Sequence, residues 1–310
     1  MSRKTLIKTY TRRDILKAGT ASAIAVNFLP ARVFGANERI TMAGIGVGGK
    51  GGSDISGAGE VGEVIALCDC DFNRGGGAAK KWPKARKFTD FREMLDKMGK
   101  DIDACTVSTP DHTHAPAAIR AMNQGIHVYC QKPLTHTVWE ARQMRLVAKK
   151  NKVCTQMDNQ GTASTGMREG VEALWAGAIG EIKECHVWTN RPVWPQAPGV
   201  TKRLPEQPVP DHVDWNSFIG PAEIRPYNSG YHPFKWRGWW DYGTGAMGDM
   251  ACHTANLAYM GCKLTQPNWV EPITVGPVNP ETFPACAIVK LKCPAIKGRG
   301  PVDFFWYEGK

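Results

Sequence analysis

The 310-residue sequence predicts an α/β fold whose first half is a doubly wound parallel sheet. Two observations lead to this prediction. Apolar, strand-like runs alternate with helical patterns between residues 40 and 157. A glycine-rich turn follows the first of these runs, and an acidic residue ends the second. The length favours two domains.

The first strand is expected over residues 40–45, and it runs directly into a glycine-rich turn with the pattern G-x-G-x-x-G. The first glycine permits a tight turn, the second lets the backbone approach a pyrophosphate, and the third lets the following helix pack on the strand. One such match is weak evidence in a chain with 33 glycines, so the flanking strand and the acid support it. The glycines expected at the phosphates are Gly44, Gly46, Gly48 and Gly49.

The second strand, over residues 64–68, ends at Asp69. A carboxylate at this point is expected to bind the adenosine ribose hydroxyls of a dinucleotide. It would also repel a 2′-phosphate, so the sequence predicts NAD rather than NADP as the cofactor. Together, the strand, the glycine loop and the acid predict a Rossmann domain.

The remaining elements of this half continue the alternation of strand and helix. A capping box of Thr137 and Glu140 marks the start of one helix, and Thr89 or Asp90 can cap another. The expected helices cover residues 73–81, 91–95, 115–122 and 137–150, and the expected strands cover 102–107, 126–130 and 153–156.

Three strand ends are expected to meet beyond the carboxyl edge of this sheet, where ligands bind in such folds. They are the glycine loop, Thr109-Pro110-Asp111-His112 and Gln131-Lys132-Pro133. Lys132 is well placed there to touch a substrate oxygen near a nicotinamide. On position alone, an ordinary surface lysine in a turn explains it equally well.

The segments Thr109–His114 and Gly125–Tyr129, followed by Lys132-Pro133, resemble the Gfo/Idh/MocA family, named for glucose–fructose oxidoreductase and inositol dehydrogenase. The family usually has Glu before the lysine–proline step, whereas this chain has Gln131, which removes a negative charge beside Lys132. The resemblance extends over nearly all of residues 37–310. It implies that cofactor contacts also come from Thr109, Pro110, His112, His114, Gln131 and Lys132.

Beyond residue 157 the pattern changes. We expect a helix over 164–175, a strand over 181–188, a loop with six prolines over 191–214, and strands over 268–275, 283–293 and 302–307. The resemblance implies an α+β domain with a large, mostly antiparallel open sheet, through which the chain is expected to form a homo-oligomer. Family members usually continue further, so a C-terminal truncation that leaves an exposed sheet edge is expected.

Residues 231–243 hold six aromatic side chains among Lys, Arg, His and Asp. Aromatic faces beside hydrogen-bonding groups suit a sugar ring, although plain core packing is the competing interpretation. The candidate substrate-binding residues are Asn159, Tyr231, Lys235, Trp236, Arg237 and Trp240.

Asp249 and His253 are four residues apart, so they share one face of a helix. The resemblance implies an Asp and a His at this spacing in the active site, facing Lys132. His253, supported by Asp249, would then take a hydroxyl proton, and Lys132 would stabilise charge on the same oxygen. The competing interpretation is an Asp near a helix start and a His with ordinary partners.

Residues 1–36 are predicted to be a twin-arginine signal, with Arg12-Arg13 before a mildly apolar run, so we expect contact with the export machinery and a periplasmic location. A basic amphipathic helix is the alternative. Without these residues, which hold seven basic and one acidic side chain, the net charge falls from +10 to +4. The predicted domains are therefore 1–36, 37–157 and 158–310.

No stretch is long and apolar enough for a membrane span, and no basic stripe indicates nucleic acid. The ten cysteines include no C-x-x-C pair, so we expect buried free thiols and no structural metal. The sequence thus predicts an exported NAD-dependent oxidoreductase acting on a sugar, polyol or glycoside. Redox-neutral glycoside cleavage assisted by NAD, and carbohydrate binding without catalysis, are the alternatives.

Overall fold

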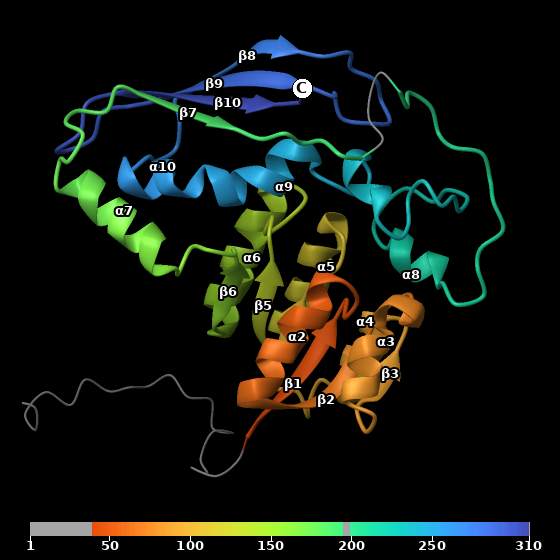
Figure 1. Ribbon diagram of the computed structural model, residues 1–310. Helices are drawn as coiled ribbons and strands as arrows, with labels where there is room; N and C mark the ends of the chain where they lie inside the picture. The colour runs from red at the N-terminus through yellow and green to blue at the C-terminus, as the bar shows by residue number, and fades with distance from the viewer. Residues whose placement is uncertain (1–38, 195–198, 310) are drawn as a thin grey trace, which may run out of the picture. The chain divides into compact units, whose positions relative to one another are not determined.

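The computed structural model describes residues 39–194 and 199–309, and it contains two separate sheets in these ranges (Figure 1). The predicted signal at 1–36 lies outside the described residues. From residue 40 onward the described chain forms one compact unit that holds both sheets. The predicted boundary after residue 157 falls inside the last strand of the first sheet.

The first sheet is parallel throughout, in the order β3-β2-β1-β4-β5-β6, which confirms the predicted doubly wound topology. Strand β3 was not predicted, because three residues are too few to show a periodic pattern. The strands are β1 (Ile40–Ile45), β2 (Gly62–Cys68), β3 (Arg86–Phe88), β4 (Ala104–Val107), β5 (His127–Gln131) and β6 (Thr155–Asp158).

Five helices connect these strands: α2 (Lys50–Val61), α3 (Phe72–Lys81), α4 (Phe91–Met98), α5 (Asp111–Asn123) and α6 (Val138–Asn151). Side-chain caps fix where three of them begin. Asp71 and Asp90 accept hydrogen bonds at the starts of α3 and α4, and both bonds of the predicted Thr137–Glu140 capping box are present. The cap on α3 helps to explain why this helix forms despite three consecutive glycines.

The second sheet has the order β7-β10-β9-β8, and all its pairs are antiparallel except β7 with β10. It confirms the mostly antiparallel sheet that the resemblance implied. Helices α8 and α10 were not predicted. The elements of this half are α7 (Thr165–Trp175), β7 (Glu184–Trp188), α8 (Trp215–Ile219), η1 (Lys235–Gly238), α9 (Gly245–Thr254), α10 (Asn256–Gly261), β8 (Trp269–Val275), β9 (Ala287–Cys293) and β10 (Val302–Glu308).

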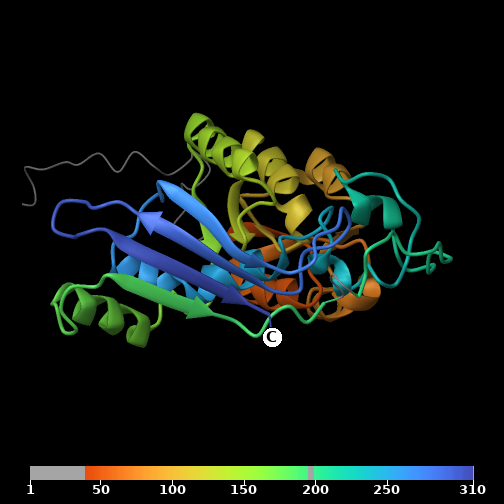
Figure 2. The same ribbon diagram turned by 90° about the horizontal axis from the view of Figure 1, so that it is seen from above.

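Helices α9 and α10 cover one face of this second sheet, while the other face is open in the view from above (Figure 2). Met250 and Ala251 of α9 and Tyr259 of α10 pack in one apolar cluster with Phe304 and Trp306. This packing fixes α9, and so it fixes the direction in which Asp249 projects.

A second aromatic cluster holds the loops between α8 and α9 in place. Phe218, Tyr231, Trp239 and Tyr242 are buried together, with ring centroids of Tyr231 and Trp239 4.6 Å apart. Tyr231, a predicted substrate contact, therefore lies in the core. Its hydroxyl accepts a hydrogen bond from the backbone of Leu204.

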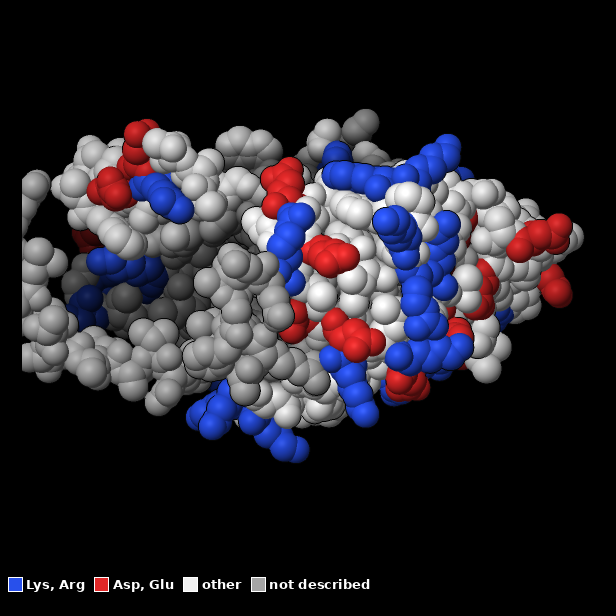
Figure 3. Space-filling model, turned by 90° about the horizontal axis from the view of Figure 1, so that it is seen from below, with Lys and Arg blue, Asp and Glu red and all other residues white. Residues whose placement is uncertain are grey.

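Charged side chains of both signs lie among one another on the face shown in Figure 3. Within the described residues, no helix is long and apolar enough to cross a membrane. In the same residues, no group of three or more His, Cys, Asp or Glu side chains is placed to hold a metal ion. All ten cysteines are free thiols.

Candidate functional site

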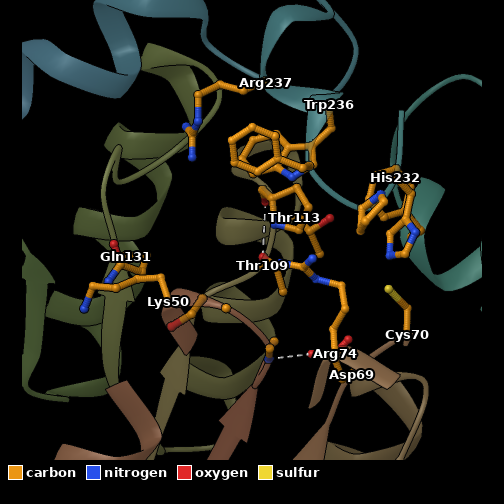
Figure 4. A pocket seen from close by; sticks show the side chains of 18 of the residues that line it. Lys50, Asp69, Cys70, Arg74, Thr109, Thr113, Gln131, His232, Trp236 and Arg237 are labelled. Atoms are coloured by element: carbon orange, nitrogen blue, oxygen red, sulfur yellow. Dashed lines mark hydrogen bonds between the residues drawn. The ribbon is translucent and has the colours of Figure 1, made fainter. Parts of the chain in front are cut away.

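A cavity of about 500 Å³ lies at the carboxyl end of the parallel sheet, and both halves of the chain line it. Figure 4 shows Asp69, Arg74 and Cys70 on one side of this pocket, with Trp236 and Arg237 on the other. The glycine loop, Thr109 and Gln131 come from the strand ends that were expected to meet here. The volume lies within the range that is usual for small-molecule sites.

The glycine loop has the close backbone approach that a dinucleotide site needs. Gly46 has a φ of 74°, and a Cβ there would lie 2.7 Å from the carbonyl oxygen of Ser108. The close approach of α2 to the loop depends on Gly51, because a Cβ on Gly51 would overlap the carbonyl oxygen of Gly46. The prediction that Gly49 plays this packing role was wrong, since a Cβ on Gly49 would meet only the Arg74 side chain.

Asp69 follows β2 and lines the pocket. One of its carboxylate oxygens accepts hydrogen bonds from the backbone N–H groups of Val47 and Gly48, both at 2.9 Å. Burial raises the pKa of Asp69, although these bonds act in the opposite direction. The carboxylate thus fixes the shape of the glycine loop, and its contact with a ribose stays a prediction.

Thr109, Pro110 and His114 line the pocket, whereas His112 lies behind it. The ring nitrogens of His112 lie 2.9 Å from the carbonyl oxygen of Phe218 and 3.2 Å from that of Tyr242, and burial lowers its pKa to about 4. His112 therefore joins α5 to the second half of the chain. The predicted cofactor contact of His112 is not in the pocket wall, because its ring turns toward those carbonyl groups.

Gln131 sits in a polar cluster that the sequence did not reveal. Its amide nitrogen donates to Asp54 at 2.8 Å and also to Asp158. Lys50 pairs with the same two carboxylates, at 2.8 Å from Asp158. A Glu at position 131 would bring a third carboxylate to one ammonium group, and this explains why Gln suits the position.

Lys132 and Asp249 meet at the pocket, as predicted from opposite halves of the chain. The Lys132 ammonium donates to the Asp249 carboxylate and to its carbonyl oxygen, both at 2.8 Å. Arg237 lies 3.3 Å from the same carboxylate, and Arg191 lies 3.8 Å from it. Three cations therefore surround one carboxylate on the pocket wall.

His253 lies one turn after Asp249 on α9 and is half-buried. Burial and the charge of Lys132 lower its pKa, and a hydrogen bond to the backbone of Gln160 acts against this. The Asp249 carboxylate forms ion pairs with Lys132 and Arg237. It therefore orients Lys132, whereas it was expected to orient His253. A lowered pKa favours the neutral imidazole, the form that can accept a proton, but His253 is not among the residues that line the pocket.

Of the predicted substrate contacts, Trp236 and Arg237 line the pocket. The Arg237 guanidinium stacks 4.3 Å from a ring centroid of Trp236, and its NH1 nitrogen donates to the buried Asp111. The other candidates point elsewhere. Lys235 is exposed, Asn159 donates to the carbonyl oxygen of Cys252, and Trp240 donates to that of Asn279.

Several residues of the pocket wall were not predicted from the sequence. His232 and Phe234 belong to the aromatic run that was singled out, so the signal was present but its members could not be sorted. Arg191 and Trp194 stand in the proline-rich loop, which offers no periodicity to read.

Two family models match the chain. The model for the oxidoreductase family with an NAD-binding Rossmann fold matches residues 39–159, and the model for the family's C-terminal alpha/beta domain matches residues 190–272. Together they cover about two thirds of the chain. The first domain is an NAD-binding Rossmann domain.

Among curated proteins, a 1,5-anhydro-D-fructose reductase of Ensifer adhaerens is 29% identical over 119 residues, which are 38% of this chain and 35% of that protein. An inositol 2-dehydrogenase of Rubrobacter xylanophilus is 30% identical over 117 residues, 36% of this chain and 32% of that protein. Each match thus spans about a third of the curated relative's length.

Among solved structures, the WlbA dehydrogenase from Bordetella pertussis in complex with NADH and UDP-GlcNAcA superposes with a TM-score of 0.61 at 18% identity. The superposition covers 86% of this chain and 72% of that one, and it shows a shared fold. With both family models matched in order along the sequence, the chain belongs to the Gfo/Idh/MocA oxidoreductase family.

Proposed function

We propose that the chain is an NAD-dependent oxidoreductase that acts on a CH–OH group of a sugar, polyol or glycoside. The observation that carries this proposal is the Lys132 ammonium, held at 2.8 Å by Asp249 in the same pocket as the glycine loop. A fixed hydrogen-bond donor beside a nucleotide site can stabilise charge on a reacting oxygen.

The pocket residues suit NAD. The backbone around Gly46 would approach the pyrophosphate, Asp69 would meet the adenosine ribose, and Thr109 and Pro110 would lie along the cofactor toward Lys132. Bound NAD would supply the hydride acceptor. The carboxylate of Asp69 favours NAD over NADP, because its negative charge would repel the 2′-phosphate of NADP.

Lys132 would donate a hydrogen bond to the substrate hydroxyl oxygen and stabilise it as its proton leaves. Asp249 holds the ammonium in position. Arg237 and Arg191 also pair with this carboxylate, so its negative charge is shared among three cations. His253, kept neutral by burial and by the charge of Lys132, would take the proton.

A carbohydrate fits the walls of the substrate end. Trp236 supplies partly exposed aromatic surface that can pack on the apolar face of a sugar ring, and the Arg237 guanidinium beside it offers N–H donors to hydroxyl groups. The names of the matched relatives, an anhydrofructose reductase and an inositol dehydrogenase, support the same substrate class.

Export by the twin-arginine machinery to the periplasm is part of the proposal, and it rests on the Arg12-Arg13 pattern alone. That route moves proteins already folded, so a cofactor can be taken up before export. We therefore propose that NAD is held tightly and recycled on the protein.

The test is a screen of sugars, polyols and glycosides against the purified chain, with the bound nucleotide identified by mass. The proposal expects NAD in the protein and a rise in reduced-nicotinamide absorbance with at least one compound. Sugar release without net reduced nicotinamide would contradict net oxidation, and carbohydrate binding without any absorbance change would contradict catalysis.

A further inference from the structure

Two thiols outside the pocket lie close enough to react with one another. The Sγ atoms of Cys185, on β7, and Cys262, at the end of α10, are 3.5 Å apart. They are 77 residues apart in the sequence. Among the ten cysteines, all of them in described residues, this is the one thiol pair within hydrogen-bond distance.

We propose that Cys185 and Cys262 are a redox-active pair that forms a disulfide between β7 and α10. A disulfide needs its sulfur atoms about 2 Å apart, so the two must approach by roughly 1.5 Å. Side-chain rotation and a small shift of the chain end of α10 can supply this. Cys262 caps that helix, and Lys263 follows it in a left-handed conformation with a φ of 50°.

The reaction requires an external disulfide as oxidant. Cys185 is partly exposed while Cys262 is buried, so the Cys185 thiolate would attack first and form a mixed disulfide, releasing one thiol. The Cys262 sulfur would then attack Cys185 Sγ and displace the second thiol. One S–S bond forms in the protein, the oxidant's S–S bond is reduced to two thiols, and the two protein thiol protons are taken up in those products.

The local environment makes this reaction slow rather than absent. Burial and the neighbouring thiols, Cys262 and then Cys293, raise the pKa of Cys185 to about 12, while Arg299 acts in the opposite direction. Because the thiolate is the attacking species, little of it is present at neutral pH. The pair is therefore expected to persist as thiols until a disulfide oxidant has had time to act.

The bond would tether the helices that carry the proposed catalytic side chains. In Figure 1, α10 runs beneath the strands of the second sheet and continues from α9. Asp249 and His253 stand on α9, and α9 and α10 pack in the same apolar cluster as both cysteines. A disulfide between β7 and α10 should make local unfolding of α9 and α10 less frequent.

The experiment uses the purified full chain incubated with oxidised glutathione, then unfolded with an alkylating agent and mapped by mass spectrometry. The expected result is a linked peptide pair holding Cys185 and Cys262, lighter by two hydrogen atoms than the sum of the reduced peptides. Cys262→Ser should leave Cys185 joined to glutathione. Cys293→Ser, a matched change in the same cluster, should keep the link.

Two outcomes would overturn the proposal: both thiols alkylated after oxidation of the wild type, or Cys185 linked to Cys293 instead. Slower hydrogen exchange of α9 and α10 in the oxidised wild type, absent in Cys262→Ser, is expected from the tether. Unchanged exchange would contradict it. None of these measurements needs cofactor or substrate, so the result does not depend on the proposed function.

Discussion

At the scale of single residues, the carboxylate of Asp249 is the shared ion-pair partner of the positively charged side chains at the substrate end of the pocket. Lys132, Arg237 and Arg191 all face it, and Asp111 takes up the remaining charge of Arg237 through a buried ion pair. The ammonium of Lys132 is thus held by a partner whose own charge is shared. Such an arrangement fixes a donor in place without neutralising it.

The pKa of His253 should lie below its usual value and should depend on Lys132. Burial lowers it first and the Lys132 charge second, so the neutral imidazole persists to lower pH than in an unfolded chain. In Lys132→Met the positive charge is gone, and the pKa of His253 should rise. NMR titration of the His253 ring measures this directly, and an unchanged pKa would show that the two side chains do not interact.

Gln131→Glu should destabilise the chain, because it places a third carboxyl group against Asp54 and Asp158. A loss on the order of 1–3 kcal/mol at pH 7 is expected. Since the new carboxyl would have a raised pKa, the loss should shrink as pH falls and the group is protonated. Urea unfolding at pH 7 and pH 5 measures it, and Gln156→Glu, exposed on the neighbouring strand, is the matched control.

At the scale of elements, α2 depends on one glycine for its position. Gly51→Ala would force a Cβ against the carbonyl oxygen of Gly46, so α2 or the loop must move. We expect a loss of about 1–3 kcal/mol in the free energy of unfolding and weaker NAD binding. Denaturant unfolding and calorimetric titration with NAD measure the two effects.

Gly57 offers the control within the same helix. It is exposed, and a Cβ there would meet nothing within 4 Å. Gly57→Ala should therefore raise stability by about 0.5–1 kcal/mol and leave NAD binding unchanged. If Gly51→Ala behaves like Gly57→Ala, the close packing of α2 on the glycine loop is not required.

Most of the parallel sheet could be predicted from the sequence, because the signals for its elements are local. The glycine loop, the caps Asp90 and Thr137 and the apolar runs each act within a few residues, so each could be read alone. The polar cluster could not be read in this way. Lys50 and Asp158 are 108 residues apart, and only the packed strands bring them together.

The site was partly readable for the same reason. Lys132 and Asp249 are 117 residues apart, and the family resemblance supplied the link that spacing could not. In the aromatic run, Tyr231 turns into the core and Trp236 into the pocket. This segment is a series of turns with one 3₁₀ helix, so no period sorts its side chains between the two.

At the scale of the whole molecule, the second sheet leaves apolar side chains exposed on β8. Every residue of this strand is exposed, and Trp269, Val270, Ile273 and Val275 are each at least 42% exposed. Association of two copies through this sheet, which is expected from the sequence and stays a prediction, would cover them. Trp269→Glu with Ile273→Glu should then shift sedimentation toward the monomer. Ile224→Glu, a change of an exposed residue outside the second sheet, should not.

The contact between Lys132 and Asp249 joins the two halves of the chain at the pocket and carries the proposed chemistry. Asp249→Asn keeps the shape of the side chain but removes the negative charge that holds the Lys132 ammonium. This variant should therefore turn over substrate more slowly than the wild type. Lys235→Met, on an exposed lysine outside the pocket wall, is the control for loss of a positive charge.

The most direct measurement is the turnover of Lys132→Met on a compound found by the screen, together with its NAD affinity. We expect turnover to fall by a factor on the order of 10²–10⁴ while NAD affinity stays close to that of the wild type. The double variant with Asp249→Asn should be little worse than Lys132→Met alone, because the pair acts as a unit. Near-wild-type turnover in Lys132→Met, with NAD still bound, would contradict the assignment of this lysine to the reaction.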